Sequence, residues 1–119
     1  MTTAMRGAGE AAADARAESV AANVAAPLML AAAFAQAGAA AGTAATGEEA
    51  AGKLRDRRVL HISSGAARKP YAGWSVYCAT KAALDHHARA VQLDAVPGLR
   101  ICALAPGVID TGMQAEIRA

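Results

Sequence analysis

The chain has 119 residues, of which 36 are alanine and only four are aromatic. A chain of this length forms one domain at most, and alanine methyl groups add little to a hydrophobic core, so a large self-sufficient enzyme is excluded. The net charge of +2 is far below the basic excess that is typical of nucleic-acid-binding domains.

The N-terminal part of the chain divides into a tail and a helix. Residues 1–17 are low in complexity and rich in Ala and Gly, without a periodic apolar face or the pattern of a signal peptide. Residues 18–36 predict a helix, because apolar side chains recur along one face. The uncharged stretch 20–41 is long enough to span a bilayer, but it is mostly alanine, which favours a buried helix over a membrane span.

The segment before the first predicted strand carries little information. Residues 37–56 are rich in Ala, Gly and Thr and predict a loop or a frayed extension of the helix. The basic run at residues 53–58 is either a phosphate-binding patch or a solvated loop, and we favour the loop.

The cysteines and histidines do not form a recognisable metal or disulfide pattern. Cys78 and Cys102 have no CxxC motif and no histidine at ligand spacing, so we predict small buried thiols in a reducing cytoplasm. The adjacent His86 and His87 would point about 100° apart on a helix, which prevents them from sharing a metal ion.

The C-terminal half predicts a strand–helix–strand unit. Residues 58–62 and 99–105 are short apolar runs that predict strands, and residues 74–95 predict the strongest helix of the chain, closed by Pro97 and Gly98. Two strands that are joined through a helix form a parallel pair, and the connection between them is a right-handed crossover. Because the apolar runs show little alternation, we expect both faces of the strands to be covered.

Polar groups gather at the carboxyl edge of this unit, where ligands of open α/β sheets bind. Ser64 follows the first strand, Tyr77 and Lys81 share one face of the helix at i and i+4, and Pro106-Gly107 ends the second strand. An ammonium group one turn from a phenol stabilises the phenolate, so the set predicts an acid–base site. Taken alone, the YxxxK spacing is that of any two neighbouring side chains on one helix. The serine and the glycine turn favour an acid–base site.

Four motifs together resemble the short-chain dehydrogenase/reductase family in their order and spacing. They are Asn23-Val-Ala-Ala-Pro27, Ile62-Ser-Ser64-Gly65, Tyr77-Cys-Ala-Thr-Lys81 and Ala105-Pro106-Gly107-Val-Ile-Asp-Thr111. The stretch 70–89 is similar to the sepiapterin and benzil reductase subgroup. The resemblance implies a partial domain over residues 18–119, with the second half of a Rossmann-like, doubly wound parallel sheet. The family's TGxxxGxG and NNAG motifs have no counterpart, and the chain ends soon after Thr111, where the family continues into a substrate-covering segment and a last strand. The resemblance therefore predicts truncation at both ends.

The resemblance implies an NAD(P)-dependent carbonyl reductase or alcohol dehydrogenase, and the subgroup favours NADP(H). Tyr77 is then the general acid, Lys81 holds the nicotinamide ribose and supports the tyrosine, Ser64 orients the substrate carbonyl, and Asn23 anchors a water in the proton relay. The implied cofactor-binding residues are Tyr77, Lys81, Pro106, Gly107, Val108, Ile109 and Thr111. The implied substrate-binding residues are Ser64, Gly65, Tyr71 and Trp74.

Two of these roles have structural alternatives. Pro27 lacks an N–H, so the carbonyl of residue 23 is free to bind a water, but Pro27 is also consistent with a kinked packing helix. Tyr71 and Trp74 wall the substrate pocket or pack in a core or interface.

The expected partners are a small carbonyl substrate and further copies of the chain, bound through helices 18–36 and 74–95. We expect neither nucleic acid nor membrane nor metal as a partner, and a cytoplasmic location. The alternative function is that of an inactive fragment that acts at most as an oligomerisation partner.

Overall fold

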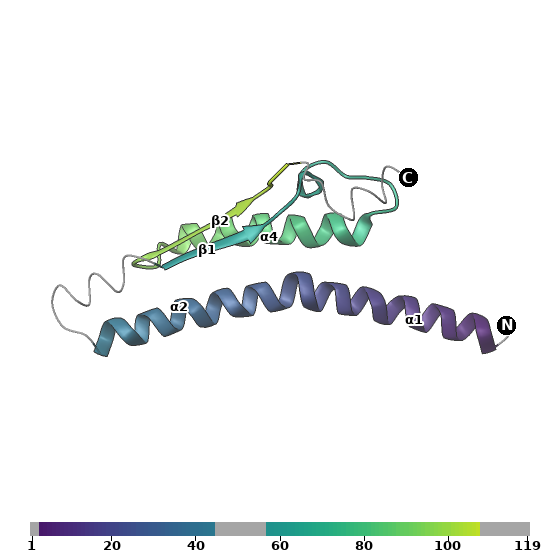
Figure 1. Cartoon of the computed structure of the whole chain (residues 1–119), viewed down its shortest axis with the longest axis horizontal. Coiled ribbons are helices and arrows are strands. Elements are labelled where there is room, and N and C mark those ends of the chain that lie inside the picture. Colours follow the sequence, from purple (N-terminus) through teal and green to yellow (C-terminus); the bar gives the residue numbers. More distant parts are fainter. Residues whose placement is uncertain (1–2, 45–56, 108–119) are drawn as a thin grey trace.

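The computed structural model describes residues 3–44 and 57–107, and a parallel βαβ unit lies at its centre. Strand β1 (Arg57–Ile62) leads through helix α4 (Ser75–Asp94) to strand β2 (Leu99–Leu104). The strands pair in parallel, with Arg57 opposite Leu99 and Ile62 opposite Leu104. Figure 1 shows α4 running along the two strands. The predicted strand–helix–strand unit is confirmed, and the fold is a partial, Rossmann-like α/β fold.

The two strands are covered on one face only. Side chains alternate along a strand, and here one set, with His61 and Ile101, is buried beneath α4. The other set is open, and Leu60, Ile62 and Leu104 are each about half exposed. The prediction that both faces are covered is therefore wrong for the described residues, because their helices all pack on one side of the sheet.

Helix α4 owes its position to a stripe of side chains at helical spacing. Thr80, Leu84 and Ala88 follow one another every four residues and are buried against the sheet. The helix ends at Ala95, which has a left-handed backbone with φ of 50°, and Gly98 (φ 72°) completes the turn into β2. The predicted closure of this helix before residues 99–105 is thus confirmed.

The N-terminal part is one long helix with an irregular centre. Helix α1 (Thr3–Val20) continues through the π-helical turn η1 (Ala21–Ala25) into α2 (Ala26–Ala44), shown from purple to blue in Figure 1. The helix exceeds the predicted 18–36 at both ends, since alanine forms helix without any apolar face to bury. The supposed tail is therefore helical from Thr3, and the extension beyond residue 36 is helical to Ala44.

The π-helical turn lies directly before Pro27. The N–H of Ala26 donates to the carbonyl of Ala21, five residues back, instead of four. Proline has no N–H to continue the regular α-helical ladder, and a local π turn is one way for the helix to absorb that loss. The helix is therefore irregular directly before Pro27, and the irregular turn contains Asn23. Whether the Asn23 carbonyl binds a water stays a prediction.

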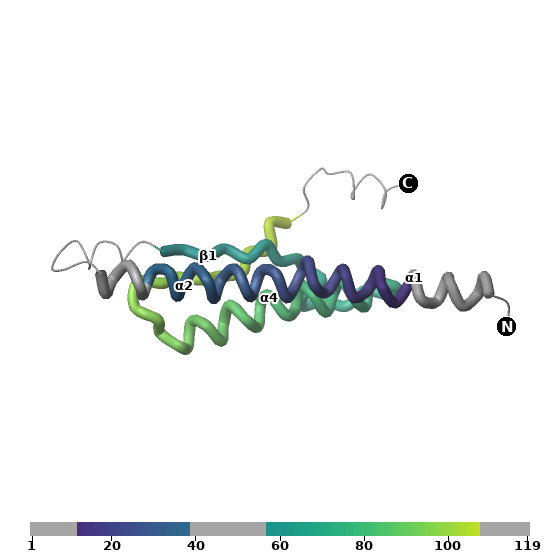
Figure 2. Tube along the Cα trace, turned by 90° about the horizontal axis from the view of Figure 1, so that it is seen from below, coloured from purple at the N-terminus to yellow at the C-terminus, as the bar shows by residue number. Residues whose placement is uncertain are grey.

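The long helix is mostly exposed. It lies beside α4 and β1 in both views (Figures 1 and 2). Among its described side chains only Ala31 is buried, whereas Met29 and Leu30 are 71% and 70% exposed. The predicted buried helix is therefore wrong, because its partners contact it along one side only. The stretch Ala12–Gly38 is long and apolar enough to cross a membrane, a test of length and composition that core helices of soluble proteins and signal sequences also pass.

A buried arginine links the long helix to the sheet. The Arg57 guanidinium donates to the carbonyl of Ala35 at 2.6 Å and to that of Pro97 at 2.9 Å. These bonds join α2 to the turn that precedes β2. A Cβ on Gly38 would overlap the guanidinium, so the glycine is the residue that lets the two segments approach.

A histidine pair links β1 to α4 beneath the sheet. Nε2 of the buried His61 lies 3.0 Å from Nδ1 of His87, so one ring donates a hydrogen bond and the other accepts it. Burial lowers the pKa of His61, and the charge of His87 lowers it further. The folded chain therefore resists protonation of His61.

We expect this histidine to make the fold less stable in mild acid. The unfolded chain takes up a proton below the ordinary histidine pKa of 6.5, while the folded chain does not until a lower pH. The free energy of unfolding should therefore fall as the pH drops below about 6.5, by at most about 1.4 kcal/mol per pH unit for one proton. Urea unfolding at pH 7.5 and 5.5 measures this slope. His61→Gln should reduce the slope and His86→Gln, at an exposed site, should not; equal slopes in both variants would contradict the assignment.

Candidate active site

Tyr77 and Lys81 lie one turn apart at the beginning of α4, as predicted. The Lys81 ammonium donates to the carbonyl of Ile62 at 2.8 Å and lies 5.8 Å from the centre of the Tyr77 ring. Ile62 is the last residue of β1, so this bond fixes the lysine at the carboxyl edge of the sheet. The arrangement places a cation beside the face of the Tyr77 ring.

Ser64 lies just beyond the same strand, at the entrance to the 3-10 turn η2 (Gly65–Ala67). Its Oγ accepts a hydrogen bond from the N–H of Ala66 at 3.2 Å, which fixes the side chain as the cap of η2. A hydroxyl that accepts from the backbone keeps its own hydrogen for donation. Because η2 packs on α4, the serine is on the same edge as the tyrosine and lysine.

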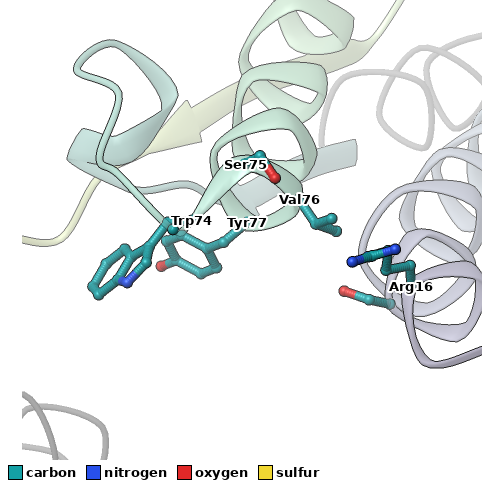
Figure 3. Close-up of a pocket in the computed structure, with 7 residues that line it drawn as sticks. Arg16, Trp74, Ser75, Val76 and Tyr77 are labelled. Carbon is teal, nitrogen blue, oxygen red and sulfur yellow. The ribbon is translucent and has the colours of Figure 1, made fainter. Parts of the chain in front are cut away.

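Three aromatic rings form a continuous row beside this edge. The centres of Tyr71 and Trp74 are 5.6 Å apart, and Trp74 meets Tyr77 edge-on at 5.7 Å. Trp74 is half-buried and Tyr71 is 46% exposed. A cavity of about 450 Å³ opens beside Trp74 and Tyr77 (Figure 3). The three rings pack against one another, and Trp74 and Tyr77 also line the cavity. The role of Tyr71 and Trp74 as the wall of a substrate pocket stays a prediction.

The end of β2 supplies the described part of the predicted cofactor turn. The N–H of Ser63 donates to the carbonyl of Leu104 at 2.7 Å, which holds the two strand ends together. Pro106 and Gly107 follow as exposed residues, and Gly107 has a φ of 83°, a conformation that favours glycine. The other predicted members of this turn, Val108, Ile109 and Thr111, lie outside the described residues.

The helical turn that contains Asn23 lies near the site, but the Asn23 side chain is bonded within its own helix. The turn η1 packs against α4, which carries Tyr77 and Lys81. The Asn23 amide, however, donates to the carbonyl of Ser19 at 2.8 Å on its own helix and is exposed. The structure brings Ser64, Tyr77 and Lys81 to one edge, and it brings only the backbone segment of Asn23 to them.

Two polar features were not predicted from the sequence, namely the histidine pair and Arg16. The pair of His61 and His87 was available from the spacing, since His61 alternates with exposed neighbours on β1 and His87 lies three residues after the buried Leu84. Arg16, by contrast, lines the cavity beside Tyr77 although it belongs to the supposed tail. A low-complexity segment gives no periodic signal from which that position could be deduced.

A parallel βαβ unit with Ser64 and a YxxxK pair at its carboxyl edge, where ligands of open α/β sheets bind, defines a Rossmann-like α/β protein. Residues 41–119 match the sequence model of the family described as short chain dehydrogenase. The chain belongs to this short-chain dehydrogenase family of oxidoreductases.

The chain is similar to several characterised members over part of their length. It is 48% identical over 66 residues to a benzil reductase ((S)-benzoin forming) of Bacillus cereus, covering 53% of this chain and 26% of that protein. It is 41% identical over 58 residues to the sepiapterin reductase of Rattus norvegicus, covering 49% and 22%. A crystal structure of a short-chain dehydrogenase/reductase from Burkholderia vietnamiensis matches with a TM-score of 0.58 and 60% identity, covering 82% of this chain and 39% of that one. The chain thus spans about a quarter of the length of the curated relatives.

Proposed function

We propose that the chain carries the acid–base half of an NAD(P)-dependent carbonyl reductase. The observation that carries the proposal is the attachment of Lys81 to the carbonyl of Ile62, beside the ring of Tyr77 and next to Ser64. This geometry gathers a phenol, an ammonium and a hydroxyl at the edge of a parallel sheet where ligands bind. The printed names of the relatives, benzil and sepiapterin reductases, support reduction of a ketone carbonyl.

In the proposed reaction Tyr77 moves the proton. As a carbonyl is reduced, negative charge develops on its oxygen, and the Tyr77 hydroxyl donates the proton that neutralises it. The Lys81 ammonium stabilises the resulting phenolate through space. In the reverse direction the same phenolate accepts the proton of an alcohol.

Ser64 is the proposed orienting group. Its Oγ is fixed by the N–H of Ala66 and keeps a hydrogen to donate to the substrate oxygen, so the carbonyl is held in one direction. Asn23 keeps its proposed role as a water anchor through its backbone carbonyl, because its side chain is bonded to Ser19. This role follows the irregular helix before Pro27, where the regular backbone bonding is interrupted.

The described residues fit the nicotinamide end of such a cofactor. The Lys81 ammonium has three N–H groups, of which one is bonded to the Ile62 carbonyl, so two can donate to the ribose hydroxyls. Gly107 leaves open space where a side chain would begin, next to the end of β2. When bound, the nicotinamide supplies the hydride. Our proposal favours NADP(H) on the likeness to the sepiapterin and benzil reductases.

Titration of the purified chain with NADPH and with NADH tests the proposal. Trp74, the single tryptophan, lies beside the site and reports binding through its emission, together with the fluorescence of the reduced cofactor. We expect saturable binding that Lys81→Met weakens about tenfold, the effect of one charge-assisted hydrogen bond. Arg89→Met removes a positive charge from the exposed part of the same helix and should leave the affinity unchanged.

Two results of this titration would overturn the proposal. One is the absence of saturable binding by a folded chain, with folding verified by near-UV circular dichroism. The other is equal binding by the wild type and by Lys81→Met. The predicted homo-oligomer, the cytoplasmic location and the absence of nucleic-acid and membrane partners stay predictions from the sequence.

A further inference from the structure

The cavity beside Tyr77 has a cationic wall that the proposed acid–base chemistry does not use. Its volume is about 450 Å³, and it lies between α1 and the first turn of α4 (Figure 3). Arg16 and Ser19 line it from α1, and Trp74 and Tyr77 line it from the other side. Among the described residues, no carboxylate lines this cavity to balance the arginine. The cavity therefore combines a positive charge, hydroxyl groups and aromatic surface.

The Arg16 guanidinium is available to a ligand. Within the described side chains, 12–38 and 57–107, no hydrogen bond or ion pair of Arg16 is formed, and the side chain is exposed. Figure 3 shows its guanidinium directed toward the beginning of α4, across the cavity. A guanidinium is charged at every physiological pH, and its planar set of N–H groups matches a carboxylate in a two-bond arrangement.

From this arrangement we propose that Arg16 binds a carboxylate on the substrate, so that keto acids are among the substrates. The inference rests on the proposed function of Tyr77 and adds the substrate class. In Figure 3 the Tyr77 hydroxyl lies on the side of Trp74, whereas Arg16 faces the opposite side of the ring. The reacting carbonyl and the carboxylate are therefore expected at different ends of the substrate. The aromatic face of Trp74 accommodates the apolar part of the molecule.

A matched pair of probes tests this assignment without any turnover. Benzoylpropionate is an aryl ketone whose carboxylate is two methylene groups from the carbonyl, and its methyl ester has the same shape without the charge. Quenching of Trp74 emission gives the Kd of each probe for the full chain. We expect benzoylpropionate to bind saturably, and Arg16→Gln to raise its Kd about tenfold while the Kd of the ester stays the same. Arg16→Lys, which keeps the charge but not the planar fork, should restore part of the loss.

The outcomes separate this inference from the proposed function. If benzoylpropionate binds equally to the wild type and to Arg16→Gln, or does not bind saturably to a folded chain, the keto-acid assignment is wrong. If its binding depends on Arg16 but the chain binds no reduced cofactor, the anion site stands and the reductase proposal fails. If the chain binds the reduced cofactor but the Kd of benzoylpropionate shows no dependence on Arg16, only the substrate class fails. Glutamine is a good helix former, so the exposed Arg16→Gln change preserves α1.

Discussion

Replacing Tyr77 by phenylalanine should lower the rate of NADPH-dependent ketone reduction by a factor of about 10² to 10⁴, the usual contribution of a general acid. The change removes the hydroxyl that donates the proton and keeps the ring that packs edge-on against Trp74. The loss should therefore appear in kcat, while binding of substrate and cofactor changes little. NADPH oxidation with benzil as the substrate measures the rate.

The control for this experiment lies at the far end of the same helix. Leu93 is 86% exposed on α4 and remote from the catalytic edge, so Leu93→Ala should keep the rate of the wild type. Undiminished turnover by Tyr77→Phe would remove Tyr77 from the chemistry and leave the lysine and serine without a proton donor.

The grouping of Ser64, Tyr77 and Lys81 at one edge of the sheet could be predicted because its signals are local and independent. Ser64 follows an apolar strand, Tyr77 and Lys81 are separated by one helical turn, and Gly107 follows the second strand. Parallel pairing then brings the carboxyl ends of both strands to one edge without any further information. The hydrogen bond from Lys81 to Ile62 joins two of these signals in space, as the topology requires.

The long helix could not be predicted in the same way, because its alanines have no apolar face that would set its limits. Helix propensity alone extends it to Thr3 and Ala44, and with that extension comes the position of Arg16 beside Tyr77. The exposure of the helix was also unpredictable, since an uncharged alanine-rich segment is compatible with burial and with solvent. The sequence gives the hydropathy of this segment, but the packing of neighbouring helices and strands decides how much of its surface is covered.

Replacing the buried Arg57 by alanine should destabilise the fold by about 2–4 kcal/mol. The change removes charge-assisted bonds to the carbonyls of Ala35 and Pro97, and with them the connection between α2 and the turn before β2. Arg100→Ala is the matched control, because Arg100 is an exposed arginine on the neighbouring strand. The two substitutions change the intrinsic strand propensity by the same amount. Its effect should stay within about 0.5 kcal/mol. Urea unfolding followed by Trp74 emission measures both, and equal effects would contradict the role of Arg57.

A second substitution shows whether Arg57 and Gly38 act as one contact. Alanine normally stabilises a helix by about 1 kcal/mol relative to glycine, so Gly38→Ala alone would be favourable on an isolated helix. Here a Cβ at this position overlaps the Arg57 guanidinium, and the substitution should destabilise the wild type. In the Arg57→Ala background the space is free, and the same substitution should become stabilising. This reversal of sign is the signature of direct coupling in a double-mutant cycle, and additive effects would show that the two residues do not meet.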